Sequence, residues 1–193
     1  MKLKKPSIQM REILATLAKK VVNREPQTRG RRAAVSIVLS DRIAPKVLLI
    51  RRSERDGDPW SGQIAFPGGK FQAEDESLRQ TAIRETLEEV GIDLAAKSDF
   101  LGYLRTFRTH TGDMDVVPTV FLLREECPVR INEEVASFMW ADLAGMLSGE
   151  ANSTFRVRRG DEFRDAPAFK VGAYVIWGLT HRIISSLVGE DSP

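Results

Sequence analysis

Three glutamates, Glu85, Glu88 and Glu89, are spaced so that their carboxylates could act together. If this segment is helical, they stand at positions i, i+3 and i+4 and share one face of the helix. Like charges at these spacings destabilise an isolated helix by roughly 0.2–0.5 kcal/mol per pair. A divalent cation such as Mg²⁺ or Mn²⁺ offsets this repulsion and takes oxygen ligands, usually together with waters and substrate phosphates. The cluster therefore predicts a metal-dependent enzyme that acts on a phosphate compound.

Residues on both sides of the glutamates fit the same chemistry. Arg84 lies four residues before Glu88, close enough to orient its carboxylate by a charge-assisted hydrogen bond. Gly68 and Gly69 precede the helix, and without side chains their backbone can approach a metal ion or a phosphate closely. The alternative is a solvated acidic face with glutamate–arginine pairs, which does not explain why so many unusual residues occur at fixed spacing.

The glutamates need a helix whose ends and buried side can be predicted. Asp75 or Ser77 is a suitable N-cap, and Gly91 stands where a left-handed residue would end the helix. Apolar residues recur at helical intervals along its other face. The predicted buried stripe is Leu78, Ile83, Leu87 and Val90.

The rest of the chain predicts an α/β fold, with a mixed sheet flanked by helices, because strands both precede and follow this helix. Pro118 falls inside one predicted strand, which indicates an edge position or a bulge. Ser7 is the expected N-cap of the first helix. Further helices are predicted over 8–22, 141–147 and 174–188, and strands over 33–39, 47–52, 63–66, 101–107, 116–123, 138–140, 155–158 and 163–170.

Length and composition are typical of one globular domain. The 193 residues divide into an N-terminal helix and linker, 1–32, and a main domain, 33–193. The net charge of +2 does not suggest a nucleic-acid partner, and no apolar run reaches the ~20 residues of a membrane helix. Cys127 is the single cysteine, so we expect no intrachain disulfide and a cytoplasmic location.

Residues 69–92 resemble the Nudix box, which that family writes as G-x5-E-x7-R-E-U-x-E-E-x-G-U, where U is bulky and apolar. Thr86 is a weak member at a position that is usually more apolar. The first half differs in length: counted back from the box arginine, the box glycine falls on Lys70 and the box glutamate on Glu76. The second half matches at Arg84, Glu85, Glu88, Glu89, Gly91 and Ile92.

The actual glycine, Gly69, stands one residue early, so the loop before the helix carries one extra residue. In this it is similar to the coenzyme A pyrophosphatase branch of the family, which has Phe-Pro-Gly-Gly, a longer loop and an Asp before the helix. Ile50 replaces a threonine of that branch's upstream signature, and Gly57 stands where its second arginine belongs. The residues that match this branch are Leu48, Leu49, Arg52, Ser53, Gly62, Phe66, Pro67, Gly68, Gly69 and Asp75.

The resemblance implies an α/β/α sandwich that binds Mg²⁺ or Mn²⁺ through Gly69, Glu85, Glu88 and Glu89, with Arg84 orienting Glu88. It further implies hydrolysis of a small-molecule nucleotide: coenzyme A or acyl-CoA, giving adenosine 3′,5′-bisphosphate and a phosphopantetheine. ADP-ribose, a dinucleotide or a nucleoside triphosphate is the alternative substrate. A non-catalytic module that binds a nucleotide or a protein is the alternative of another class. Many relatives are dimers, so a homodimer is possible.

The upstream segment supplies candidate substrate contacts. Arg52 and Arg55 could contact phosphates, Arg55 as a shifted substitute for the missing arginine; both could instead be plain surface charges. Trp60 could stack on an adenine ring or serve as a core or interface aromatic. Gly68 would bring its backbone to the substrate.

Four acidic residues have two interpretations each. Asp75 and Glu76 could cap the helix and complement its dipole, or Glu76 could bind a metal through water. Glu133 and Glu134 precede a predicted strand where several Nudix enzymes carry an additional catalytic acid; otherwise they belong to a solvated loop.

The two histidines receive different expectations. His110 lies in a polar loop that could cover the metal site and supply a base or a substrate contact, or it could belong to a surface turn. His181 stands among apolar residues of the last predicted helix, and a structural role is favoured.

Overall fold

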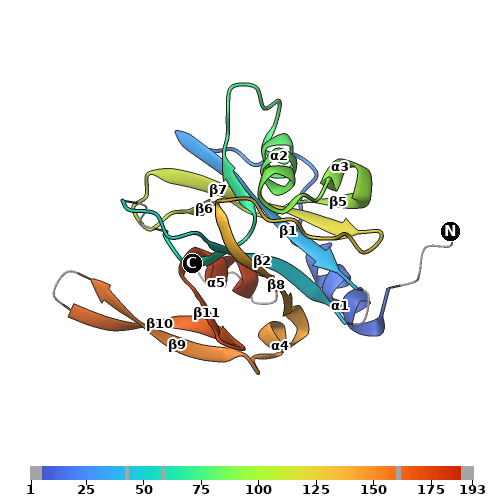
Figure 1. Cartoon of the computed structure of the whole chain (residues 1–193). Helices are drawn as coiled ribbons and strands as arrows, with labels where there is room; N and C mark the ends of the chain where they lie inside the picture. The colour runs from blue at the N-terminus through green and yellow to red at the C-terminus, as the bar shows by residue number, and fades with distance from the viewer. Residues whose placement is uncertain (1–5, 42–43, 58–59, 160–161, 188–193) are drawn as a thin grey trace.

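A computed structural model describes residues 6–41, 44–57, 60–159 and 162–187 of the chain. In these residues an eight-stranded mixed sheet lies between helices on both faces, and a three-stranded sheet adjoins it (Figure 1). The predicted α/β/α sandwich is confirmed. The helices are α1 (Ile8–Leu17), α2 (Leu78–Val90), α3 (Leu94–Lys97), α4 (Leu143–Ser148) and α5 (Gly178–Ser185). The strands are β1 (Arg31–Ser40), β2 (Lys46–Arg52), β3 (Ile64–Ala65), β4 (Gly68–Lys70), β5 (Ser98–Tyr103), β6 (Phe107–Arg108), β7 (Met114–Leu123), β8 (Val135–Asp142), β9 (Asn152–Arg159), β10 (Glu162–Val171) and β11 (Tyr174–Trp177).

Strand β1 organises the large sheet. It pairs in parallel with β7 along its length, from Arg31↔Met114 to Leu39↔Leu122. On its other edge it pairs antiparallel with β4 at its beginning and with β2 at its end. β2 continues the sheet to β3 and β8, and β7 continues it to β5 and β6. The short β4 is thus held beside the start of the longest pairing in the molecule.

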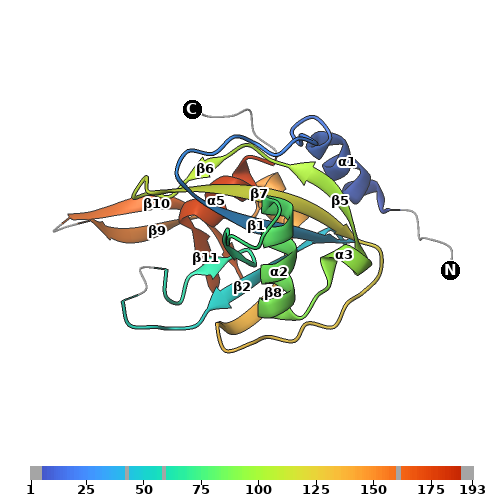
Figure 2. The same cartoon turned by 90° about the horizontal axis from the view of Figure 1, so that it is seen from above.

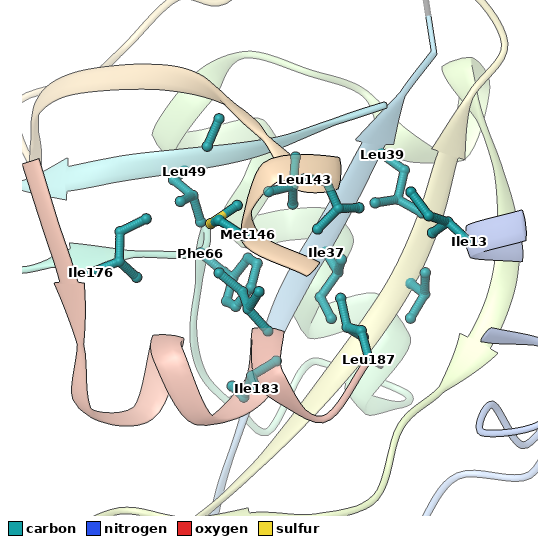
Figure 3. Packing of buried hydrophobic residues seen from close by; sticks show 14 of the residues in the cluster. Ile13, Ile37, Leu39, Leu49, Phe66, Leu143, Met146, Ile176, Ile183 and Leu187 are labelled. Atoms are coloured by element: carbon teal, nitrogen blue, oxygen red, sulfur yellow. The ribbon is translucent and has the colours of Figure 1, made fainter. Parts of the chain in front are cut away.

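Alternate residues of β1 face two separate cores. Ala34 and Val38 pack with α2 and α3, whereas Ile37 and Leu39 pack with α1, α4, α5 and strands of the small sheet. Figure 3 shows the second of these cores. Burying one such aliphatic side chain contributes roughly 1.5–3 kcal/mol. The first core fixes α2 against the sheet, and the second joins both ends of the chain to it.

The N-terminal helix is part of the second core. Ser7 caps α1 as predicted, accepting from the Met10 N–H, and Met10 and Leu17 are almost fully buried. The helix ends at Leu17, earlier than predicted, because the chain then turns and Val22 exchanges two backbone hydrogen bonds of 2.9 Å with Tyr103. The polar segment that follows therefore runs along the folded domain towards β1.

Two further predictions about elements are corrected. Of the two alternatives predicted for Pro118, the edge position is wrong, because β7 pairs with β1 on one side and with β5 and β6 on the other; the β5–β7 pairing does carry an irregularity nearby, between Phe100 and Gly102. Pro118 lies at the break between β5 and β6, where the Leu104 N–H donates to the Pro118 carbonyl, so its missing N–H interrupts no continuous ladder. The predicted helix 174–188 begins instead with strand β11, and α5 starts at Gly178; position 188 lies outside the described residues.

The small sheet has the order β11-β10-β9, and its β9–β10 hairpin extends away from the main body (Figure 2). Stacking of Phe155 on Trp177, with ring centroids 5.1 Å apart, and burial of Phe169 fix its base. No helix in the described ranges is long and apolar enough to cross a membrane.

Candidate active site

The catalytic helix candidate, α2, is fixed at both ends by residues of the predicted types. Ser77, rather than Asp75, is its N-cap and accepts from the Gln80 N–H at 3.1 Å. A second acceptor comes from the N-terminal segment, where a Glu25 carboxylate oxygen accepts from the Leu78 N–H at 2.7 Å. Gly91 ends the helix in the left-handed conformation, with φ of 70°.

The buried side of α2 differs from the predicted stripe at one position. Leu87 is 49% exposed, so the prediction that it is buried was wrong. Thr86 and Glu89, on either side of it along the helix, are buried instead. The sheet side of α2 is thus partly polar, and these polar groups require partners.

Two buried hydroxyls supply partners between α2 and β1. The Ser36 and Thr86 hydroxyl oxygens lie 2.7 Å apart, and they lie 3.1 and 2.7 Å from the Ala82 carbonyl. The Ser36 N–H donates to the Pro67 carbonyl at 2.8 Å. Ser36 therefore ties β1 both to the helix and to the turn that leads into β4, which gives a reason for a threonine at the usually apolar box position 86.

The Gly68–Gly69 turn packs directly against two of the predicted glutamates. The Gly68 N–H donates to a Glu89 carboxylate oxygen at 2.8 Å. A Cβ placed on Gly69 would come within 2.4 Å of the Glu85 carboxylate. Gly68 has φ of 151°, and a Cβ there would lie 2.3 Å from the Ala34 carbonyl oxygen. Glycine at position 69 thus allows β4 to approach Glu85 of α2, and glycine at position 68 allows it to approach Ala34 and Val35 of β1.

Arg84 is the hub of the ionic contacts on this side of α2. Its Nε and Nη2 each donate to one oxygen of Asp75 at 3.0 Å, a two-pronged contact. Its Nη1 donates to Glu85 at 2.8 Å and to Glu88 at 3.2 Å, so the expected contact with Glu88 is present. Its Nη2 also donates to the Lys70 carbonyl at 3.2 Å, which links α2 to β4.

The surroundings lower the pKa of one carboxyl group of the site and raise the pKa of two others. Hydrogen bonds from Arg84 lower the pKa of Asp75 to about 2, against the cost of its burial, and they raise the pKa of Arg84. Burial raises the pKa of Glu85, although Arg84 opposes this. Burial raises the pKa of Glu89 to about 8, and the Gly68 N–H opposes the shift only in part. Asp75 is thus a fixed anion, whereas none of the ion pairs between described residues involves Glu89.

A divalent cation fits this arrangement. Glu89 is a buried and Glu85 a half-buried carboxylate, and their mutual repulsion contributes to the raised pKa of Glu89. Oxygen donors of this kind suit Mg²⁺ or Mn²⁺, which would offset that repulsion. Glu88 is 52% exposed at its side chain and is occupied by Arg84. Over the described ranges, no three acidic, histidine or cysteine side chains already converge as a ligand set, so waters and substrate oxygens would complete the coordination.

Other predicted residues lie around this centre. The charge of Arg52 acts on Glu89 to lower its pKa, and Glu134 raises the pKa of both Glu85 and Glu89. Arg55 lies 3.4 Å from Glu134. The 53–63 loop and the segment before β8 therefore meet beside the glutamates, and the Ser53 hydroxyl donates to the Glu133 carbonyl across this junction at 2.9 Å.

The remaining predicted residues lie in more open positions. Trp60 is 38% exposed in the loop after β2, His110 is exposed in the turn between β6 and β7, and Glu76 is exposed before α2. Their substrate or metal contacts stay predictions. His181 packs on Phe169, with ring centroids 4.4 Å apart, and burial lowers its pKa.

The sequence interpretation missed three residues that position the site. It gave Asp75 a capping role, whereas Asp75 binds Arg84. The extra residue in the loop was the signal, because it moves Asp75 relative to the box position of Glu76. Glu25 lies in a polar linker that carries no pattern. Ser36 lies in an apolar strand, where only an unexpected hydroxyl facing Thr86 could have indicated it.

Taken together, the sandwich fold and the carboxylate helix beside a glycine turn define a phosphate-processing hydrolase site. The Nudix-domain family model matches residues 30–159. The Nudix hydrolase NudL of Yersinia pestis is 37% identical over 165 residues, covering 84% of this chain and 81% of that protein. This chain belongs to the Nudix family and is a pyrophosphohydrolase.

Other comparisons agree on the domain and the fold. An uncharacterized protein of Schizosaccharomyces pombe is 42% identical over 120 residues, which are 58% of this chain and 36% of that protein, so the match spans about a third of its length. The Caenorhabditis elegans Ap4A hydrolase structure is similar with a TM-score of 0.50, at 20% identity over 60% of this chain and 83% of that one. The structure of a MutT/Nudix family protein from Enterococcus faecalis is similar with a TM-score of 0.54, at 19% identity over 92% of this chain and 67% of that one.

Replacing Asp75 by Asn should reduce hydrolysis of a diphosphate substrate by about tenfold to a hundredfold. Hydrogen bonds to charged groups contribute about 1.5–3 kcal/mol, and about 1.4 kcal/mol corresponds to a tenfold change. The matched variant Glu76→Gln, at the position that the family spacing selects, should change the rate by less than about twofold. Steady-state rates, with thermal melting to check folding, test this; a larger loss in Glu76→Gln than in Asp75→Asn would contradict it.

The metal-free protein should lose stability as pH rises from about 4.5 to about 8. In this window folded Glu89 still holds a proton that the unfolded chain, with its ordinary pKa of 4.5, has released. The free energy of unfolding therefore falls with pH. Thermal melting with a chelator present should show a decline that is smaller in Glu89→Gln. Identical pH profiles for the two proteins would refute the assignment.

Proposed function

We propose that this Nudix enzyme hydrolyses coenzyme A or acyl-CoA to adenosine 3′,5′-bisphosphate and a phosphopantetheine. The observation that carries the proposal is the contact between Asp75 and Arg84. Asp75, nine residues before Arg84, makes this contact, whereas Glu76, which the general box spacing selects, is exposed. A longer loop with an Asp before the helix is the feature that resembles the coenzyme A pyrophosphatase branch.

Residues of the upstream signature support the proposal, because they lie beside the glutamates. Arg52 acts electrostatically on Glu89, and Arg55 pairs with Glu134. A guanidinium can bind a phosphate with two parallel hydrogen bonds, so Arg52 and Arg55 are suited to the diphosphate. Trp60, exposed in the same loop, offers an aromatic face to an adenine ring.

Glu85 and Glu89 would hold Mg²⁺ or Mn²⁺ beside the Gly68–Gly69 turn, with Glu88 as an outer ligand reached through water. When bound, such an ion neutralises diphosphate charge and lowers the pKa of a water that attacks phosphorus. Arg84 holds Glu85 and Glu88 in place, and Asp75 holds Arg84. Gly69 packs against the Glu85 carboxylate without a side chain between them, which holds the end of that carboxylate beside β4.

In the proposed reaction, water cleaves the diphosphate bridge of the substrate. The attacking water adds its oxygen to one phosphorus of the diphosphate, and the bridging P–O bond breaks with the second phosphate as leaving group. The water's protons pass to a carboxylate of the site and to solvent. A cytoplasmic location is part of this proposal, because Cys127 is the single cysteine of the sequence and a reducing compartment suits it.

With Mg²⁺ or Mn²⁺, the chain should cleave coenzyme A with a higher kcat/KM than ADP-ribose, diadenosine compounds or nucleoside triphosphates. Mass spectrometry should identify adenosine 3′,5′-bisphosphate and 4′-phosphopantetheine as products. Glu89→Gln serves as the inactive control and should remove turnover while the protein stays folded. Cleavage of ADP-ribose at least as fast as coenzyme A would overturn the substrate assignment, and full activity of Glu89→Gln would overturn the metal site.

A further inference from the structure

A basic hollow lies next to the active site but apart from its glutamates. It encloses about 260 Å³ and is lined by Gly30, Arg31, Arg32, Lys70, Phe71 and Met114. These residues come from the beginnings of β1 and β7 and from the end of β4, where Arg31 pairs with Met114 and Ala33 with Lys70. The hydrogen bonds described above for the glutamates of α2 involve Gly68 and Arg84, neither of which lines the hollow.

The strand register places Arg31 and Lys70 on the face of the sheet away from Glu85, whereas Arg32 and Phe71 lie on the α2 face, so the hollow opens at the strand ends between the two faces. Gly69 faces Glu85, and successive residues of a strand point to opposite faces, so Lys70 points away from the glutamates. Lys70 pairs with Ala33, which packs with Met114 and Leu179 of the opposite core. A ligand with its diphosphate at Gly69 would therefore have to pass the edge of β4 to reach Lys70.

The charge around the hollow is positive. The ion pairs of its two arginines are long: Arg31 to Asp113 at 3.9 Å, which is exposed, and Arg32 to Glu25 at 3.7 Å, which is half-buried. Long pairs that are at least partly exposed are weak, so these guanidinium groups remain able to bind an anion. Among the described residues the lining carries three cations, Arg31, Arg32 and Lys70, and the ion-pair partners of these cations are two carboxylates, Asp113 and Glu25.

Two of the cations belong to segments held in place by α2. The Arg32 guanidinium lies 3.5 Å over the centre of the Phe71 ring, and its partner Glu25 also accepts from the Leu78 N–H at the start of α2. The Lys70 carbonyl accepts from Arg84. The basic hollow is thus fixed relative to the catalytic helix before any ligand binds, which lowers the entropic cost of binding.

We propose that the basic hollow binds a phosphate monoester carried by the nucleotide part of the substrate, separate from the diphosphate that is cleaved. A compact dianion suits a lysine ammonium beside two guanidinium forks. This inference rests on the proposed function, in which the group is the 3′-phosphate of coenzyme A. Such a site distinguishes coenzyme A from ADP-ribose, which carries no phosphate monoester.

Calorimetric binding of adenosine 3′,5′-bisphosphate and of AMP to the full chain with Mg²⁺ tests the inference without turnover. The wild type should bind the bisphosphate about tenfold or more tightly than AMP, and Lys70→Ala or Arg31→Ala should each reduce this preference by about three- to tenfold. Lys170→Ala, an exposed lysine on β10, is the matched control and should leave it unchanged. Equal affinity for the two nucleotides, or a preference that survives both variants, would overturn the inference.

Turnover separates this inference from the proposed function. If coenzyme A is cleaved well but Lys70→Ala retains the wild-type preference for coenzyme A over 3′-dephospho-coenzyme A, the basic hollow is not the phosphate site although the function stands. If ADP-ribose is the better substrate while the bisphosphate still binds through Lys70, the phosphate site stands and the coenzyme A assignment fails.

Discussion

The close approach of the Gly68–Gly69 turn to α2 is the constraint on which the rest of the site depends. It places a backbone N–H on Glu89 and leaves no room for a side chain beside Glu85. A buried carboxylate is costly unless it is hydrogen-bonded or paired. The pairing of β4 with β1, and of Ser36 with Thr86, keeps the turn and the helix at this distance.

Arg84 divides the carboxylates of the site into two classes. Its two-pronged contact keeps Asp75 ionised, and this anion in turn fixes the arginine. Arg84 also donates to Glu85, whereas within the described residues Glu89 accepts from the Gly68 N–H and has a pKa raised to about 8. A site built in this way holds its arginine without a metal ion but stabilises its deepest carboxylate only when a cation is supplied. Negative charge from Glu85 and Glu89 thus accumulates at the place where a metal ion is expected.

Local patterns predicted the elements that carry the chemistry. The caps of α2 at Ser77 and Gly91, the strand segments β1 and β2 and the spacing of the glutamates all depend on residues near one another in sequence. Predictions failed where distant segments decide the outcome. Pro118 is tolerated inside the sheet because a neighbouring strand breaks opposite it, and Tyr174–Trp177 forms a strand because β10 offers an edge.

The same distinction applies to the site. The box residues could be read from spacing, but the choice of Asp75 over Glu76 depends on how the longer loop folds back onto Arg84. The N-terminal segment reaches α2 through Glu25, and the opposite face of β4 carries Lys70; both depend on tertiary contacts that no short-range pattern contains. Tertiary packing therefore set the positions of the groups around the glutamates.

Mn²⁺ titration of Gly69→Ala tests the central claim most directly. Gly69 has no left-handed backbone to strain, so the substitution changes only the space between β4 and the Glu85 carboxylate, where a Cβ would come within 2.4 Å. Our account predicts that the variant stays folded and binds Mn²⁺ about tenfold or more weakly than the wild type, since about 1.4 kcal/mol corresponds to a tenfold change. Unchanged Mn²⁺ affinity in a folded Gly69→Ala protein would contradict it.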